Sequence, residues 1–278
     1  MLPPGFDPAS VRAIATDLDG TILDPVTFRP SQRTIAAVHA AEACGIHVIL
    51  ATGRMFQSAR RVAAELDVHT PLVCYQGGLV ADPITGEWLL HRPLSVDLAV
   101  EILHALGPHA RTTNAYVDDE LYVTEANDEA IRYAEIAGVE MHVAGDLASW
   151  LTRPTTKLVT VGEESWLDPL RDEMQARFAG RAFVAKSLPI FLEFAAPDVS
   201  KSSALAFLGT RLGFSAAECV AFGDGENDRD LLVWAGLGVC VANASDRLKS
   251  EADCVIPAVT EDGVAQFIEQ VVAARAAV

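Results

Sequence analysis

Short apolar runs and helical periodicities alternate over the first part of the chain. The apolar runs have the length of buried strands, and the segments between them carry hydrophobic residues at helical spacing. Strands that alternate with helices predict right-handed βαβ units and a parallel sheet. These strands and helices are expected, in order, at residues 11–16, 31–45, 47–52, 55–67 and 71–75.

The middle of the chain follows a different pattern. A hairpin is expected around residues 83–86, and a helix at 96–107 follows it. Shorter and more polar strands are expected at 112–117, 120–124, 156–161, 181–186 and 190–195, with helices near 129–137 and 167–178. Because strands and helices do not alternate regularly here, the segment is typical of an α+β module, with boundaries near Pro83 and Pro197.

Regular alternation resumes after Pro197. Ser200 is the expected N-cap of a helix that starts at Lys201. Further strands and helices are expected at 218–225, 228–236, 237–243, 246–252, 254–257 and 263–276. The sequence therefore predicts an α/β fold, in which residues 1–83 and 197–278 form a Rossmann-like parallel-sheet core and residues 84–196 form an inserted α+β domain.

Charge limits the kinds of partner. The 278 residues include 21 Lys and Arg against 38 Asp and Glu, a net charge of −17. A nucleic-acid partner would require a basic patch, so we expect none. An anionic substrate would need a metal ion or local cations to offset the negative field.

Cysteines and apolar stretches exclude further classes. None of the five cysteines lies in a CxxC pair, so the sequence indicates neither a disulfide framework nor a zinc site. The N-terminal residues lack the basic segment and apolar core of a signal peptide. The longest apolar stretch, at 231–244, is too short and too rich in glycine to span a bilayer. We therefore expect a cytoplasmic protein with no membrane partner.

Two aspartates, Asp17 and Asp19, end the first apolar run, and Gly20 follows them. In a strand, residues i and i+2 point to one face, so the two carboxylates would repel each other unless something compensates their charge. One interpretation is a turn, which accounts for Asp19 and Gly20 but poorly for Asp17. The other is a cation site at the end of a strand.

A second acidic cluster, "FGDGENDRD", includes Asp224 and Asp228. Asp228 stands where a carboxylate would stabilise the N-terminus of a helix. That interpretation does not explain why a second strand of the same sheet also ends in a carboxylate. Neither cluster is an EF-hand, because Ile22 and Arg229 stand where the loop requires glycine. Two strand ends with carboxylates favour a hard cation such as Mg²⁺ together with a phosphorylated substrate.

Four motifs, in this order, resemble those of the haloacid dehalogenase (HAD) superfamily. They are "DLDGT" from Asp17, "ATGR" with Thr52, "SKSSAL" with Lys201, and "GDGENDRDLL" with Asp224. The segment between the second and third motifs is similar to the α/β (type IIB) cap of the Cof-type phosphatases. The resemblance covers essentially the whole chain.

The resemblance implies a role for each matching residue. Asp17 would be the nucleophile and Asp19 the general acid and base. Mg²⁺ would be held by Asp17, the backbone carbonyl of Asp19 and Asp224, with Asp228 close behind. The phosphoryl group would be bound by Thr52, Gly53, Lys201 and Asn227, and Asn243 would flank the site.

One position departs from the family pattern. The subfamily usually has an Asn-Gly pair after the third strand, where this chain has Gln76 and Gly77. The change lies outside the four motifs and is expected to affect the loop between core and cap.

The expected function is that of a Mg²⁺-dependent phosphatase for small phosphomonoesters, with sugar phosphates as the first candidates. The expected partner is a small phosphorylated metabolite, and the expected state is a monomer or a weak homodimer. Two alternatives remain open at this point: a phosphomannomutase-like phosphotransferase and a non-catalytic sugar-phosphate sensor.

Overall fold

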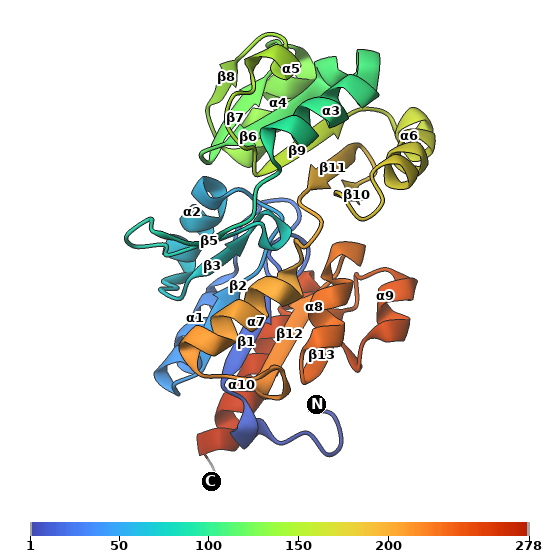
Figure 1. Ribbon diagram of the computed structural model, residues 1–278. Helices are drawn as coiled ribbons and strands as arrows, with labels where there is room; N and C mark the ends of the chain where they lie inside the picture. Colours follow the sequence, from blue (N-terminus) through green and yellow to red (C-terminus); the bar gives the residue numbers. More distant parts are fainter. Residues whose placement is uncertain (1, 277–278) are drawn as a thin grey trace. The chain divides into compact units, whose positions relative to one another are not determined.

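The chain divides into two compact units in the computed structural model, which describes residues 2–276 and all their side chains except those of residues 129, 136, 137, 187 and 188. Unit 1 comprises Met1–Gly53, Ala59–Leu89 and Ser200–Val278. Unit 2 comprises Leu90–Val199 together with Arg54–Ser58. Unit 1 is thus assembled from segments that lie on both sides of unit 2 in the sequence (Figure 1).

A five-stranded parallel sheet forms the centre of unit 1, in the order β14-β13-β12-β1-β2. The strands are β1 (Ala13–Thr16), β2 (His47–Leu50), β12 (Cys219–Gly223), β13 (Leu237–Val241) and β14 (Cys254–Ile256). Every residue of β1, β12 and β13 is buried. Strands buried along their whole length are covered on both faces, which explains their continuous apolar sequences.

Helices of unit 1 begin and end at residues suited to those positions. Ser31 caps one helix and Ser200 another, each accepting a bond from the backbone N–H three residues on. Helix α1 packs against α10, and α7 packs against α8. The helices are α1 (Gln32–Ala43), α2 (Phe56–Leu66), α7 (Lys201–Leu212), α8 (Arg229–Trp234), α9 (Asp246–Glu251) and α10 (Gly263–Ala276). Helix α2 belongs to unit 1 from Ala59 on, whereas its first residues fall in unit 2.

A second, three-stranded sheet has the order β3-β4-β5. It consists of β3 (Leu72–Cys74), β4 (Leu79–Ala81) and β5 (Trp88–His91). A short 3₁₀ turn, Tyr75–Gly77, joins β3 to β4. Both Tyr75 and Gln76 in this turn have positive φ angles, 52° and 58°. Residues with side chains rarely adopt this conformation, so this turn is strained.

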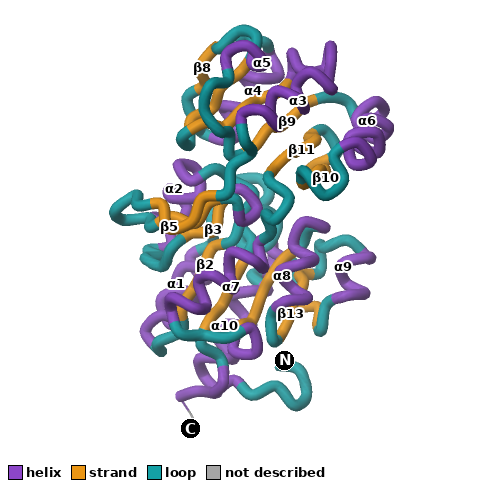
Figure 2. The backbone as a smooth tube through the Cα atoms, viewed as in Figure 1, coloured by secondary structure: helices purple, strands orange, loops and turns teal. Residues whose placement is uncertain are grey.

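Unit 2 contains a six-stranded sheet in the order β10-β11-β9-β6-β7-β8, in which only the β7–β8 pair is parallel. The strands are β6 (Thr113–Val117), β7 (Glu120–Val123), β8 (Met141–Val143), β9 (Lys157–Val161), β10 (Phe183–Leu188) and β11 (Phe191–Ala195). Its helices are α3 (Val96–Leu106), α4 (Asp128–Ala137), α5 (Leu147–Trp150) and α6 (Glu164–Arg177). Figure 2 shows the helices of the chain in purple and its strands in orange.

One apolar core holds the helices of unit 2 to the sheet. Side chains from α3 and α6 meet alternate residues of β6, β9 and β11, among them Ala115, Leu158 and Phe194. Alternate residues of a strand point to one face, so this face of the sheet is the one that the two helices cover. A buried ion pair, Lys157–Glu193 at 3.0 Å, arises from the other set of alternate residues.

The α/β architecture expected from the sequence, with a parallel core sheet and an inserted α+β segment, is confirmed. Two short elements, β8 and α5, were not expected. They are three and four residues long, and β8 is half-exposed, so neither leaves a clear periodic pattern. The long segment of unit 2 begins after Leu89 and ends before Ser200, whereas boundaries near Pro83 and Pro197 were expected, and the short segment Arg54–Ser58 also belongs to unit 2. The hairpin around residues 83–86 stays with the core because β5 pairs with β4.

Among residues 2–276, none of the helices has the length and apolar character that crossing a bilayer requires.

Candidate active site

Three of the predicted residues follow neighbouring parallel strands of unit 1. Asp17 comes directly after β1, Asp224 directly after β12, and Thr52 shortly after β2. Strand β1 lies between the other two strands, and the Asp17 N–H donates to the carbonyl of Phe222 at 3.0 Å. Because carboxyl ends of parallel strands share one edge of a sheet, these residues gather where α/β folds bind ligands.

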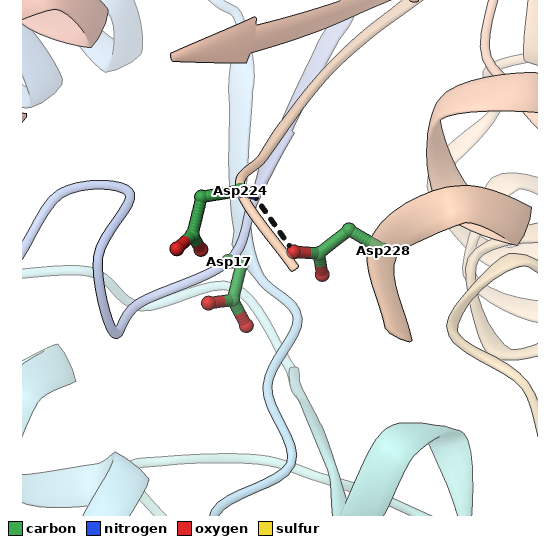
Figure 3. A group of neighbouring side chains, drawn as sticks. All are labelled: Asp17, Asp224 and Asp228. Atoms are coloured by element: carbon green, nitrogen blue, oxygen red, sulfur yellow. Dashed lines mark hydrogen bonds between the residues drawn. The ribbon is translucent and has the colours of Figure 1, made fainter. Parts of the chain in front are cut away.

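Three carboxylates from this edge converge (Figure 3). One oxygen from each of Asp17, Asp224 and Asp228 lies within 4.8 Å of the others. Asp17 and Asp228 are buried, and Asp224 is half-buried. Oxygen ligands at this separation fit a hard divalent cation such as Mg²⁺.

A fully buried ammonium group lies against two of these carboxylates. Lys201 Nζ donates to Asp17 Oδ1 at 2.6 Å and to Asp228 Oδ1 at 2.5 Å. Lys201 is the first residue of α7, and its side chain has no exposed surface. A buried charge is tolerated only when it is paired in this way.

The crowding of carboxylates shifts their ionisation. Burial raises the pKa of the Asp17 carboxyl well above its ordinary value, although the Lys201 ammonium opposes the shift. Burial, followed by repulsion from Asp228, raises the pKa of Asp224 to about 6. Burial alone would lower the pKa of Lys201, but Asp17 and Asp228 outweigh it and raise that pKa, so the lysine stays charged. One ammonium leaves this group of carboxylates with excess negative charge, which a bound cation would relieve.

The turn after β1 fits closely around Asp224. Thr21 Oγ1 donates to Asp224 Oδ1 at 3.0 Å. Gly20 has a positive φ of 78°, and a Cβ there would lie 2.3 Å from Asp224 Oδ2. Asn243 Nδ2 donates to the carbonyl of Gly20 at 2.8 Å, so Asn243 flanks the cluster. Glycine at position 20 is therefore required by both backbone conformation and space.

Asp228 also holds the loop that carries Asp224. Its Oδ2 accepts bonds from the backbone N–H groups of Asp224, at 3.0 Å, and Gly225, at 2.9 Å. Lys201 donates to the other oxygen, Oδ1, so each carboxylate oxygen of Asp228 accepts at least one hydrogen bond. The arrangement fixes the distance between Asp224 and Asp228 and ties both to α7.

Asp19 is not one of the three converging carboxylates, although its charge contributes to the raised pKa of both Asp17 and Asp224. Strand β1 ends at Thr16, so the alternation of side chains does not continue to Asp19. Asp17 is buried whereas Asp19 is exposed, and its carboxylate is not one of the three that converge. Because β1 ends before both aspartates, the alternation of side chains along a strand does not apply to them, and the shared face stays a prediction.

The remaining predicted residues meet around Gln76. The Gln76 N–H donates to the carbonyl of Thr52 at 3.0 Å, and Asn227 Nδ2 donates to Gln76 Oε1 at 3.3 Å. A Cβ on Gly53 would lie 2.6 Å from Gln76 Nε2. Thr52, Gly53 and Asn227, predicted from two separate motifs, therefore all lie against one residue, Gln76.

Sequence reasoning did not anticipate the contacts of Thr21 and Gln76. Thr21 belongs to the motif "DLDGT". Its hydroxyl, two residues after Asp19, was the sequence feature that could have indicated a contact with the acidic cluster. Gln76 was noted only as a departure from a family pattern, with an effect expected on the loop between core and cap. Its buried position beside Gly53 follows from the left-handed turn, which residue types alone do not reveal.

Comparisons with known proteins agree with the four motifs. A family model described as haloacid dehalogenase-like hydrolase matches residues 14–268. A phosphoglycolate phosphatase from Archaeoglobus fulgidus is 31% identical over 258 residues, which are 93% of this chain and 96% of that protein. The crystal structure of TM0651 from Thermotoga maritima has a TM-score of 0.82 at 31% identity, covering 94% of this chain and 97% of that chain.

A third comparison concerns the fold of both units. The structure of a sugar phosphatase of HAD subclass IIB has a TM-score of 0.80 at 20% identity and covers 94% of this chain and 98% of that chain. The fold, including the inserted segment, is therefore shared with that protein.

Proposed function

The chain belongs to the haloacid dehalogenase-like hydrolase family, as a phosphatase, and on this basis we propose that it is a Mg²⁺-dependent enzyme that hydrolyses small phosphomonoesters through an aspartyl-phosphate intermediate. The observation that carries the proposal is the convergence of Asp17, Asp224 and Asp228 at one sheet edge, with Lys201 buried against Asp17. A sheet edge with a carboxylate, a fixed cation and room for a metal ion combines what phosphoryl transfer requires.

The carboxylates provide the metal ligands in this proposal. Mg²⁺ would be held by Asp17, Asp224, Asp228 and the backbone carbonyl of Asp19, and when bound it would offset the negative charge of the phosphoryl group. Burial, followed by repulsion from Asp228, raises the pKa of Asp224 to about 6, and a bound cation would relieve that repulsion, which supports the assignment.

Asp17 and Asp19 divide the chemistry between them. A carboxylate oxygen of Asp17 attacks phosphorus, the bond to the ester oxygen breaks, and Asp19 gives its proton to the leaving alkoxide. Asp19 then takes a proton from a water molecule, which attacks phosphorus and breaks the bond to Asp17. Phosphate is released and both carboxyl groups return to their starting states. The exposure of Asp19 supports this role, because an acid and base must reach both substrate and water.

Four further groups hold the phosphoryl oxygens. Thr52 and the N–H of Gly53 would donate from the loop after β2, and Asn227 from the loop after β12. Lys201 supplies a fixed positive charge beside Asp17, which offsets the charge of the transferring group.

The proposed substrates are small phosphorylated metabolites, with sugar phosphates first. The subclass IIB neighbour acts on sugar phosphates and the Archaeoglobus relative on phosphoglycolate, so small phosphomonoesters are the class they share. We assign selection of the organic part to the inserted unit 2, a cap in the sense of that subclass.

Phosphate release tests the proposal. Sugar phosphates, phosphoglycolate, nucleotides and pyridoxal phosphate would be assayed with Mg²⁺ and with a chelator, alongside Asp17→Asn and Asp67→Asn. Asp67 has a largely exposed side chain and serves as the matched control. We expect metal-dependent release that Asp17→Asn abolishes and Asp67→Asn leaves unchanged.

Other outcomes separate the alternatives. Phosphate transfer to an added sugar, without release in its absence, would indicate the phosphotransferase. Binding of sugar phosphates by a folded, metal-loaded protein without turnover would indicate the sensor. Turnover that survives Asp17→Asn would exclude the aspartyl-phosphate mechanism.

A further inference from the structure

Gln76 occupies an unusual backbone position in the middle of unit 1. Its φ and ψ angles are 58° and 22°, and Tyr75 before it also has a positive φ. Both residues are buried, so the turn is held in place by its surroundings. Strained conformations of residues with side chains persist where the neighbouring structure requires them, and they are frequent at functional sites.

The turn that contains Gln76 touches three segments that carry predicted phosphate-binding residues. The Gln76 N–H reaches the carbonyl of Thr52, and its Oε1 accepts from Asn227 Nδ2. The next residue, Gly77, approaches the backbone at Ser200, where a Cβ would lie 2.1 Å from the carbonyl oxygen. Ser200 caps the helix that begins with Lys201. The turn therefore contacts the loop after β2, the loop after β12 and the start of α7.

The direction of the hydrogen bond to Asn227 matters. An amide nitrogen has two N–H groups, and an amide oxygen can only accept. Because Gln76 presents Oε1, Asn227 is oriented with its nitrogen toward Gln76, while its Oδ1 lies against Gly225. One N–H of Asn227 is thus used by Gln76, and the second remains for an acceptor such as a phosphoryl oxygen.

The other end of the Gln76 amide lies against Gly53. A Cβ on residue 53 would come within 2.6 Å of Gln76 Nε2 and 3.1 Å of its Cδ. Gly53 is therefore the residue that makes room for this amide, and the amide in turn limits where the loop after Thr52 can lie. The Gln76 amide therefore lies against Gly53 of the second motif through Nε2 and binds Asn227 of the fourth motif through Oε1.

We propose that Gln76 is a positioning residue for the phosphoryl group: it holds the Thr52–Gly53 loop and the Asn227 amide in one arrangement, so that the Thr52 hydroxyl, the Gly53 N–H and the Asn227 amide can donate to the same phosphoryl group. This role rests on the proposed phosphatase function. Gln76 takes no part in the transfer of the phosphoryl group itself. Its loss therefore weakens binding of the phosphoryl group in substrate and in free phosphate, and leaves the carboxylate cluster intact.

Two variants separate this role from a merely structural one. Gln76→Gly removes the side chain and also the backbone strain, because glycine adopts a positive φ without cost. Gln76→Met keeps the strain and much of the volume but cannot make the hydrogen bond to Asn227. Asp67→Gly is the matched control: Asp67 has a φ of 57°, nearly the same as that of Gln76, but lies in an exposed turn after α2.

The measurements are KM and kcat for the best phosphomonoester, the inhibition constant of inorganic phosphate, and the affinity for Mg²⁺ by calorimetry. For both Gln76 variants we expect KM and the inhibition constant to rise about tenfold, with a much smaller change in kcat. Mg²⁺ affinity and unfolding temperature report on the carboxylate cluster and on folding, and Mg²⁺ affinity is expected to stay within about twofold of the wild type. Asp67→Gly is expected to match the wild type in all the kinetic constants.

Each contrary result has a definite meaning. If either folded Gln76 variant keeps the phosphate inhibition constant of the wild type while the wild type turns over substrate, the positioning role is wrong and the phosphatase stands. If both variants lose Mg²⁺ affinity in parallel with phosphate affinity, Gln76 supports the whole site and not the phosphoryl group. If the wild type releases no phosphate from any substrate, the proposed function fails and the role of Gln76 falls with it.

Discussion

Lys201 is the single ammonium that the described structure pairs with Asp17 and Asp228. Both hydrogen bonds are short. Lys201 and Asp228 are completely buried, so water cannot replace either group if the other is removed. The residue therefore has a structural task in addition to the proposed contact with the phosphoryl group.

Replacing Lys201 by methionine is expected to destabilise metal-free protein by about 3–5 kcal/mol at pH 7.5, since two buried carboxylates would lose their counter-charge. The pKa of Asp17 is already raised by folding, so the folded chain holds that proton more tightly than the unfolded chain. Such a group costs stability as pH rises above its unfolded pKa of about 3.9. The loss should therefore be smaller at pH 5 than at pH 7.5.

Urea unfolding at the two pH values, with a chelator present, checks this prediction. Lys249→Met is the control, because Lys249 lies 3.6 Å from an exposed Asp246 and should change stability by less than about 1 kcal/mol. A Lys201 variant with equal losses at both pH values would show that charge is not the cause.

Variants at Gly20 and Gly45 distinguish the effect of backbone strain from that of steric crowding by an added Cβ. Their φ angles are 78° and 76°, but only at Gly20 would a Cβ meet a neighbour, the carboxylate of Asp224. Gly20→Ala should therefore displace Asp224 and weaken Mg²⁺ binding roughly tenfold or more, as changes around metal ligands do. Gly45→Ala should carry a similar strain without that loss. Calorimetric titration of both variants with Mg²⁺ decides the matter, and equal affinities would contradict the prediction.

Among the elements, α7 links a helix cap to the site. Ser200 accepts a hydrogen bond from Ser203 N–H at 3.1 Å, and Lys201 follows directly. Ser200→Ala is expected to reduce the free energy of unfolding by about 1 kcal/mol. Ser31→Ala removes the corresponding cap of α1, where Ser31 accepts from Thr34 at 3.0 Å, and should cost about the same.

The two cap variants are expected to differ in catalysis. Fraying of α7 moves Lys201, so Ser200→Ala should lower kcat/KM several-fold, whereas Ser31→Ala should leave it unchanged because α1 carries none of the predicted site residues. Chemical denaturation and steady-state kinetics on both variants provide the comparison. Equal kcat/KM values for the two would mean that the pairing with Asp17 and Asp228 alone fixes Lys201.

At this scale, much of the structure could be predicted. The buried strands β1, β12 and β13 are continuous apolar runs, and the caps Ser31 and Ser200 have the residue type their position favours. Their order along the chain predicts the parallel sheet, and the sheet brings Asp17 and Asp224 together. The elements β8 and α5 could not be predicted, because three or four residues are too few to show a helical or strand periodicity in hydrophobicity.

The site was predictable only as far as strand ends determine it. The position of Asp19 depends on where the chain turns after Thr16, and the position of Gln76 depends on two consecutive left-handed residues. Neither conformation has a signature in hydrophobic patterning. The bonds of Thr21 and Asn243 arise between segments that are far apart in sequence, so they emerge only once the sheet is assembled.

Across the whole molecule, a net charge of −17 opposes the approach of a phosphorylated substrate. Screening should reduce that repulsion, since the Debye length falls from about 30 Å at 0.01 M salt to about 8 Å at 0.15 M. At fixed Mg²⁺ we expect kcat/KM for a phosphomonoester to rise roughly twofold over this range. Kinetics in potassium chloride and in choline chloride would measure the effect and control for the identity of the cation. A steady fall in kcat/KM would show that cations at the site, and not the overall charge, govern capture.

Strand β1 pairs with β2 on one side and with β12 on the other, and β12 lies on the far side of unit 2 in the sequence. This strand order affects how the protein folds during synthesis. On the ribosome, β1 and β2 emerge early, but β1 must wait for Cys219–Gly223 before its second edge is covered. At synthesis rates of about 5–20 residues per second, that wait lasts on the order of 10–40 s. Throughout this time a strand that is buried along its whole length in the finished sheet presents an unpaired edge, the kind of surface through which nascent chains aggregate. The length of the inserted segment therefore sets how long this edge of the sheet stays uncovered during synthesis.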